Sequence, residues 1–193
     1  MTKTKRATDV PIYQLKVTLQ GSKPPIWRRL QVHSDTTLAE LHGIIQTAFD
    51  WWDEHLHQFT IGERYYGVPN PDYLGFAEMH DERKIGLQQI TRGEGFNFLY
   101  EYDFGDSWLH QILVEKILPA EPGQVYPVCI TGRRACPPED VGGIWGYYYF
   151  LEALQDPEHE AHEEYLEWVG DEFNPEAFDL EGINKALRSL RRR

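Results

Sequence analysis

The stretch that decides the fold runs from residue 12 to residue 52. It reads IYQLKVTL (12–19), GSKPP (21–25), IWRRLQVH (26–33) and TLAELHGIIQTAFDWW (37–52). In the first segment apolar side chains alternate with polar ones, which predicts a half-buried strand. The Gly- and Pro-rich second segment predicts a turn. We therefore expect the third segment to be the returning strand of a hairpin.

A helix is expected directly after this hairpin. Thr37 and Glu40 have the three-residue spacing of a capping box. Apolar residues then recur at intervals of three and four, which predicts one apolar stripe on a helix; they are Leu38, Leu41, Ile45, Ala48 and Trp52. A strand is expected at residues 55–61, and an irregular excursion with one short strand or helix at residues 62–95.

Two strong strands are expected at residues 96–104 and 107–117, with Gly105-Asp106 as a two-residue hairpin loop. An irregular loop over residues 128–143 then leads to helices at 144–154, 157–169 and 183–190, with Asp156 capping the second and Gly170 ending it. This order predicts an α+β fold, a β-grasp-like α/β roll in which a mixed sheet carries one helix across it, plus C-terminal helices. We expect residues 1–9 to be a disordered arm and residues 10–193 to be a single domain, with a helical extension from about residue 144.

Composition narrows the class of protein. The chain has 193 residues, 41 % of them hydrophobic, and a net charge of −12. Its apolar runs fall short of the ~20 residues needed to cross a bilayer, and no apolar segment follows the basic N-terminus, so we expect a cytoplasmic protein without a signal peptide or membrane span. Cys129 and Cys136 are then expected to be buried free thiols.

The charge is distributed unevenly along the chain. Residues 155–181 hold eleven Asp or Glu and no Lys or Arg, while residues 182–193 hold five Lys or Arg and no acid. A duplex-binding protein normally carries a basic stripe, and none is visible in this sequence. Nucleic-acid binding is therefore not favoured, and a basic partner would suit the acidic segment.

Several motifs together resemble a known family. They are IWRR (26–29), LAELH (38–42), HLHQF (55–59), YEYDFGDSW (100–108) with His110, ACPPEDVGG (135–143) and Gly146-Tyr147. The chain resembles the plasmid pRiA4b open-reading-frame-three-like family from about Ile12 to about Leu187. The resemblance implies an α/β roll carried on plasmids and other mobile elements. It transfers motif positions but no activity, cofactor or residue roles.

The second hairpin supplies the first candidate site. With a two-residue loop, Asp103 would face Trp108 and Glu101 would face His110, so all four side chains would share one face. Two carboxylates beside an imidazole can work as general acid and base, which makes Asp103, His110 and Glu101 the candidate catalytic residues. The alternative is a cross-strand charge pair on a wet face.

His55 and His57 are two residues apart in an expected strand, so their imidazoles would point the same way and could bind a divalent metal with His110 or Asp103 as third ligand. The alternative is one core and one solvated histidine. A third candidate is an anion site before the expected helix at 144–154, formed by Arg133, Arg134, Asp140, Gly142 and Gly143. There the alternative is that Asp140 caps the helix.

The sequence thus favours a non-catalytic binding or adaptor domain with a protein partner, which the acidic segment suggests is basic. The alternative is a metal-assisted or acid–base hydrolase whose site gathers His55, His57, Glu101, Asp103 and His110. A second alternative is nucleic-acid binding through Arg28, Arg29, Arg133 and Arg134. Whether the chain is an enzyme stays open, and a divalent metal is the only cofactor suggested.

Overall fold

An eight-stranded sheet forms the centre of the computed structural model, which describes residues 10–69, 78–170 and 173–190. The arm predicted at residues 1–9 lies outside the described residues. The sheet order is β5-β4-β3-β6-β7-β1-β2-β8, and every neighbouring pair is antiparallel except β4 and β5. The strands are β1 (Ile12–Leu19), β2 (Trp27–His33), β3 (His57–Ile61), β4 (Arg64–Gly67), β5 (Met79–Asp81), β6 (Asn97–Tyr102), β7 (Trp108–Leu118) and β8 (Val128–Arg133).

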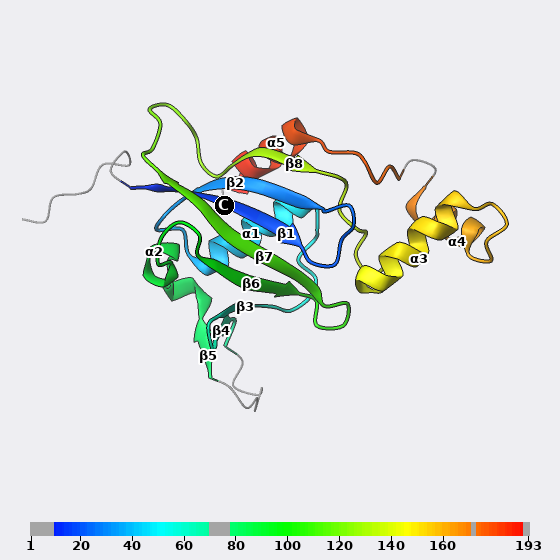
Figure 1. The fold of residues 1–193 in the computed structure, drawn as a ribbon, viewed down its shortest axis with the longest axis horizontal. Helices are drawn as coiled ribbons and strands as arrows, with labels where there is room; N and C mark the ends of the chain where they lie inside the picture. The colour runs from blue at the N-terminus through cyan, green and yellow to red at the C-terminus, as the bar shows by residue number, and fades with distance from the viewer. Residues whose placement is uncertain (1–9, 70–77, 171–172, 191–193) are drawn as a thin grey trace, which may run out of the picture.

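The helices lie on one face and at one end of the sheet. Figure 1 shows α1 behind the central strands, α5 beside β8, and the α3–α4 pair extending away from the sheet. Their bounds are α1 (Leu38–Phe49), the 3-10 turn η2 (Glu82–Lys84), α2 (Leu87–Ile90), α3 (Gly143–Gln155), α4 (His162–Val169) and α5 (Leu180–Leu190). The predicted α+β class, with one helix across a mixed sheet and helices at the C-terminal end, is therefore confirmed.

Packing follows the pattern that the first hairpin predicts. Leu15 of β1 pairs with Leu30 of β2, and both are fully buried beneath α1. The capping box of α1 also forms, because the Thr37 hydroxyl accepts from the Glu40 N–H at 3.2 Å and the Glu40 carboxylate accepts from the Thr37 N–H at 2.7 Å. This fixes the start of α1 and hence the position of its C-terminal end, where the candidate site lies.

Several element boundaries differ from the expectation. Strand β3 begins at His57 and not at residue 55, and the excursion at 62–95 holds β4, β5, η2 and α2. Strand β8 was expected to be loop; it is a short edge strand whose Cys129 faces the core. Helix α4 begins at His162, because Asp156 ends α3 and accepts the Glu158 N–H in a turn instead of capping a new helix.

Among the described residues, no helix combines the length and the apolar character that crossing a membrane requires.

Candidate functional site

Three segments that are distant in the sequence meet at one end of the sheet. They are residues 51–57 after α1, residues 103–107 between β6 and β7, and residues 136–143 before α3; we call their meeting place the motif junction. Figure 1 shows the β6–β7 loop beside the start of α3. Two motif blocks of the sequence, around Asp103 and around Pro137, therefore form one structural unit.

Hydrogen bonds hold the motif junction together. The Trp51 indole N–H donates to the Pro137 carbonyl at 3.0 Å. The Glu139 carboxylate accepts from the Trp52 backbone N–H at 2.9 Å and from the Tyr102 hydroxyl at 2.5 Å. Burial, followed by this contact with Glu139, raises the pKa of Tyr102 well above its usual range, so the phenol stays protonated and donates at physiological pH.

The β6–β7 loop is longer than the sequence suggested. Tyr102 pairs with Trp108, so five residues, 103–107, form the connection instead of two. Asp103 and Ser107 have positive φ angles of 55° and 54°, and the Asp103 carboxylate accepts the Gly105 N–H at 2.9 Å. Such a local turn is typical of Asp, whose short side chain bonds its own backbone.

This register separates the predicted catalytic residues. His110 pairs with Tyr100 and faces the core, while Glu101 pairs with Leu109 and faces the other side of the sheet, bonding Gln58 and Ser107. His110 is 0 % exposed, and its Nδ1 lies 2.9 Å from the Trp108 carbonyl oxygen. Burial lowers the pKa of His110 to about 3. The expectation that Glu101 and His110 share a face is therefore wrong.

His55 and His57, the histidines predicted to bind a metal together, belong to two different groups of side chains. Among the described residues, two groups of side chains have metal-ligand spacing: His42, Asp53 and His57 form one, and His55, Asp103 and Asp140 form the other. Neither group includes His110. Four of these six residues are sequence candidates, namely His55, His57, Asp103 and Asp140. His57, however, stacks on His42 of α1 and does not join His55.

His42 and His57 stack on each other, and each forms hydrogen bonds with other residues. Their rings stack with centroids 3.4 Å apart and planes 5° apart. His42 contacts Asp53 at 2.7 Å through Nε2 and the Tyr100 hydroxyl at 2.8 Å through Nδ1, and His57 Nε2 contacts Glu82 at 2.8 Å. Burial, and then the charge of His57, lower the pKa of His42.

A cleft of about 820 Å³ adjoins the motif junction. Its walls come from the C-terminal end of α1 and the residues after it, from residues 135–140, and from the α4–α5 region. Three tryptophans line the cleft: Trp51 is buried, whereas Trp52 is 76 % and Trp168 is 47 % exposed. A volume of this size lies in the range of ligand-binding sites.

Arg28 lies at the back of this cleft and is only 3 % exposed. Its guanidinium donates to the carbonyl oxygens of Trp27, Ala48, Arg133 and Arg134 at 2.8–3.0 Å. It also donates to the sulfur of Cys136 and lies over the rings of Phe49 and Phe178. With these donors engaged, Arg28 fixes the cleft wall and is not free to bind a ligand.

The residues of the predicted anion site have intramolecular partners. Arg134 pairs with Glu176 at 2.5 Å, and the Gly142 N–H at the start of α3 donates to the Asp106 carboxylate at 3.0 Å. Gly142 is the N-cap, so the alternative expectation that Asp140 caps this helix is wrong. Gly143 packs directly against the Asp106 backbone. The Asp106 carboxylate therefore occupies the place where an external anion would bind.

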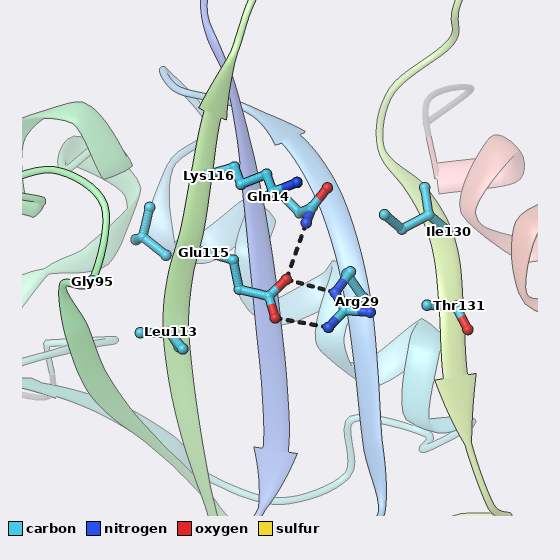
Figure 2. Close-up of a pocket in the computed structure, with 9 residues that line it drawn as sticks. Gln14, Arg29, Gly95, Leu113, Glu115, Lys116, Ile130 and Thr131 are labelled. Carbon is cyan, nitrogen blue, oxygen red and sulfur yellow. Dashed lines mark hydrogen bonds and ion pairs between the residues drawn. The ribbon is translucent and has the colours of Figure 1, made fainter.

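A second, shallow hollow of about 570 Å³ lies on the opposite face of the sheet. Figure 2 shows Glu115 of β7 between Gln14 and Arg29, with the Arg29 guanidinium forming two bonds at 2.5 and 2.8 Å and Gln14 a third at 3.1 Å. This pairing raises the pKa of Arg29 and lowers that of Glu115. Because Arg28 is buried and Arg29 is paired here, the arginines proposed for nucleic acid do not share one surface.

Both cysteines are free thiols, as predicted. Burial raises the pKa of Cys129 to about 11 and that of Cys136 to about 12. Neither thiol is therefore a thiolate nucleophile near neutral pH.

The fold and the motif junction together define an α+β roll with a cleft at one end of its sheet. The chain belongs to the plasmid pRiA4b ORF-3-like protein family, whose model matches residues 11–182. It is 39 % identical over 181 residues to Uncharacterized protein y4hQ of Sinorhizobium fredii (strain NBRC 101917 / NGR234), covering 93 % of this chain and 92 % of that protein. It also resembles the crystal structure of the protein of unknown function MM3350 from Methanosarcina mazei Go1, with a TM-score of 0.79 and 39 % identity, covering 89 % of this chain and 97 % of that one.

Sequence reasoning missed several residues of this region. His42 was read only as part of a helix, although it lies four residues after Leu38 and so on the apolar stripe, which should have flagged a buried histidine. Asp53 follows the helix in the sequence and Glu82 lies in the 3-10 turn η2, so neither is recognisable as a histidine partner from the sequence. Glu139 belongs to the ACPPEDVGG motif, but the sequence does not reveal its contact with Tyr102.

Proposed function

We propose that this protein is a binding domain whose cleft accepts a positively charged, partly apolar segment of another protein. The observation that carries this proposal is the composition of the cleft, which joins exposed tryptophans to carboxylates. A cation over an indole ring is attracted by its π-electrons, and a neighbouring carboxylate adds a direct charge interaction.

The charge of the cleft supports a basic occupant. Five acidic residues line the cleft: Asp50, Glu54, Glu139, Asp140 and Asp179. A single basic residue, Arg28, lines it, and its guanidinium is engaged by backbone carbonyls. A lysine or arginine side chain entering the cleft would therefore meet uncompensated negative charge.

The apolar part of the walls supports a peptide rather than a small cation. Besides the tryptophans, apolar side chains of the α4–α5 region line the cleft, including Val169, Phe173 and Ile183. A segment that alternates apolar and basic side chains would cover this surface and satisfy the carboxylates at the rim. A cleft of about 820 Å³ holds a few residues of such a segment.

Fluorescence anisotropy with a labelled peptide of alternating arginine and leucine tests the proposal. The measurement is made in EDTA at low ionic strength, with a glutamate–leucine peptide of equal length for comparison. We expect binding of the basic peptide to be at least about tenfold tighter than that of the acidic one, and to weaken as salt screens the charges.

Matched variants locate the binding. Trp52→Ala is expected to weaken the basic peptide about fivefold or more, the effect of losing a cation–π contact, while Trp145→Ala, 83 % exposed but outside the cleft lining, leaves it unchanged. Glu54→Gln is expected to weaken it, and Glu158→Gln, exposed and outside the cleft, is not. Equal binding of both peptides, or equal effects of the two tryptophan variants, would refute the proposal.

A further inference from the structure

We propose that His55, Asp103 and Asp140 bind one divalent transition-metal ion at the motif junction, beside the cleft. The three side chains come from three separate parts of the chain: the residues leading into β3, the β6–β7 loop, and the loop before α3. The fold, and not local sequence, brings them together.

The distances suit a shared ion. One ligand atom from each residue lies within 4.8 Å of the other two. His55 Nε2 is 3.2 Å from Asp140 Oδ1, and the other ring nitrogen, Nδ1, is 3.9 Å from Asp103 Oδ1. A single ion would use only one of these nitrogens, so one carboxylate must turn toward the nitrogen that the other already approaches. Ligands around one zinc ion at ~2.1 Å lie at most about 4.2 Å apart. Rotation of the Asp140 side chain, which is 68 % exposed, closes the remaining gap.

The imidazole of His55 lies between the two carboxylates, with one near each ring nitrogen. Its Nε2 forms an ion-pair contact with Asp140 at 3.2 Å. The 3.9 Å separation between Nδ1 and Asp103 is too long for a hydrogen bond.

The backbone holds both aspartates in an unusual conformation. Asp103 and Asp140 have φ angles of 55° and 60°, in the left-handed region that few side chains adopt. Asp103 is further fixed by its bond from the Gly105 N–H. Asp adopts this region more readily than most residues, so these turns fix the positions of the two carboxylates without themselves indicating a ligand.

The neighbouring group of His42, Asp53 and His57 does not fit an ion in the same way. A metal ion lies in the plane of each imidazole that binds it, whereas the rings of His42 and His57 are stacked, with centroids 3.4 Å apart and planes 5° apart. Because the two planes are nearly parallel, one ion cannot lie in both and so cannot bind both rings with normal geometry. Their nitrogens also have partners already.

The donor set indicates the kind of ion. Imidazole nitrogen suits zinc, copper, iron and nickel, whereas carboxylate oxygen suits magnesium, calcium and manganese. One nitrogen and two oxygens therefore suit Zn²⁺ or Mn²⁺. Three protein ligands leave coordination positions open for water or a ligand. Asp140 lines the cleft, so those positions face it.

This inference is independent of the proposed peptide binding. The peptide measurement is made in EDTA, so loss of the metal cannot cause its failure. Conversely, the metal titration is made without any peptide.

Isothermal titration calorimetry of tag-free, EDTA-treated protein with ZnCl₂, and separately MnCl₂, tests the metal site. We expect one ion per chain and an affinity at least about tenfold lower in each of His55→Ala, Asp103→Asn and Asp140→Asn. Asparagine tolerates the left-handed backbone as aspartate does, so the two amide variants should keep their fold, which circular dichroism checks. Asp53→Asn is the matched control and should bind as the parent does.

Two results would overturn the inference. One is absence of binding by the parent protein for both ions. The other is a loss of binding in Asp53→Asn that equals the loss in Asp140→Asn, because it would move the ion to the histidine pair or mark weak association with any acidic group. One-to-one binding that only the three ligand variants weaken supports the site.

Discussion

Replacing Arg28 with methionine tests how the cleft wall is built. Methionine has a similar length and can keep the apolar contacts with Phe49 and Phe178, but it donates no hydrogen bond. Four backbone carbonyl oxygens then lose the donor that holds them at 2.8–3.0 Å. The carbonyl of Ala48 belongs to the end of α1, where a cation is also favoured by the helix dipole.

The magnitude follows from these four bonds. A buried carbonyl left without a partner costs about 1–3 kcal/mol, so four at the lower limit give about 4 kcal/mol. Water entering from the cleft recovers part of this loss. We therefore expect Arg28→Met to lower the free energy of unfolding by about 2–4 kcal/mol, a large part of the stability of an ordinary domain.

Urea unfolding followed by circular dichroism measures the change. The neighbouring Arg29→Met is the control, because Arg29 lies on the opposite face of the sheet, where it pairs with Glu115 and lies over the Trp27 ring. Each of these contacts contributes about 1 kcal/mol or less at an accessible site. A loss below about 1 kcal/mol in Arg28→Met, equal to that in Arg29→Met, would refute the reasoning.

Three further predictions follow from individual residues. Gly143→Ala should cost about 1–3 kcal/mol more than Gly62→Ala in urea unfolding, because both have positive φ but only the first places its new carbon against the β6–β7 loop backbone; equal costs would contradict it. Cys129 and Cys136, with pKa values raised by burial to about 11 and about 12, should react with Ellman's reagent only after unfolding; rapid reaction of the native protein at pH 8 would count against this. The pKa of His110 is lowered to about 3, so its ring should stay neutral at pH 5 by NMR. Because the unfolded chain takes up that proton near pH 6.5 and the native one does not, this group's stabilising contribution is lost as pH falls from about 6.5 toward 3; a native His110 that titrates near 6.5 would reject the prediction.

The first hairpin and α1 could be predicted because each is coded locally. Alternation over residues 12–19 and the Thr37–Glu40 capping box depend only on neighbours in the sequence. The class of the fold followed from the order of such elements. Strand β8 could not be predicted in the same way, since it lies at the edge of the sheet and only Cys129 of its six residues is buried, which weakens the alternation.

The candidate site was predictable only as a set of motifs. Asp103, Asp140 and His55 are all candidates in the sequence, but the sequence groups His55 and Asp103 with His57, Glu101 and His110 and assigns Asp140 to a separate anion site. The error came from the hairpin, where Gly105-Asp106 looks like a tight turn, while Asp103 bonds its own loop and lengthens it to five residues. The resulting one-residue shift in register places Glu101 and His110 on opposite faces of the sheet.

The most direct test of the proposed function is an NMR titration of the tryptophan indole N–H signals with the arginine–leucine peptide. The chain has six tryptophans, whose indole signals can be assigned by substitution. The proposal predicts that Trp52 and Trp168 shift in proportion to the bound fraction, while Trp145 and Trp27 stay in place, because only the first two line the cleft. Unchanged Trp52 and Trp168 signals at a peptide concentration that saturates the anisotropy change would contradict it.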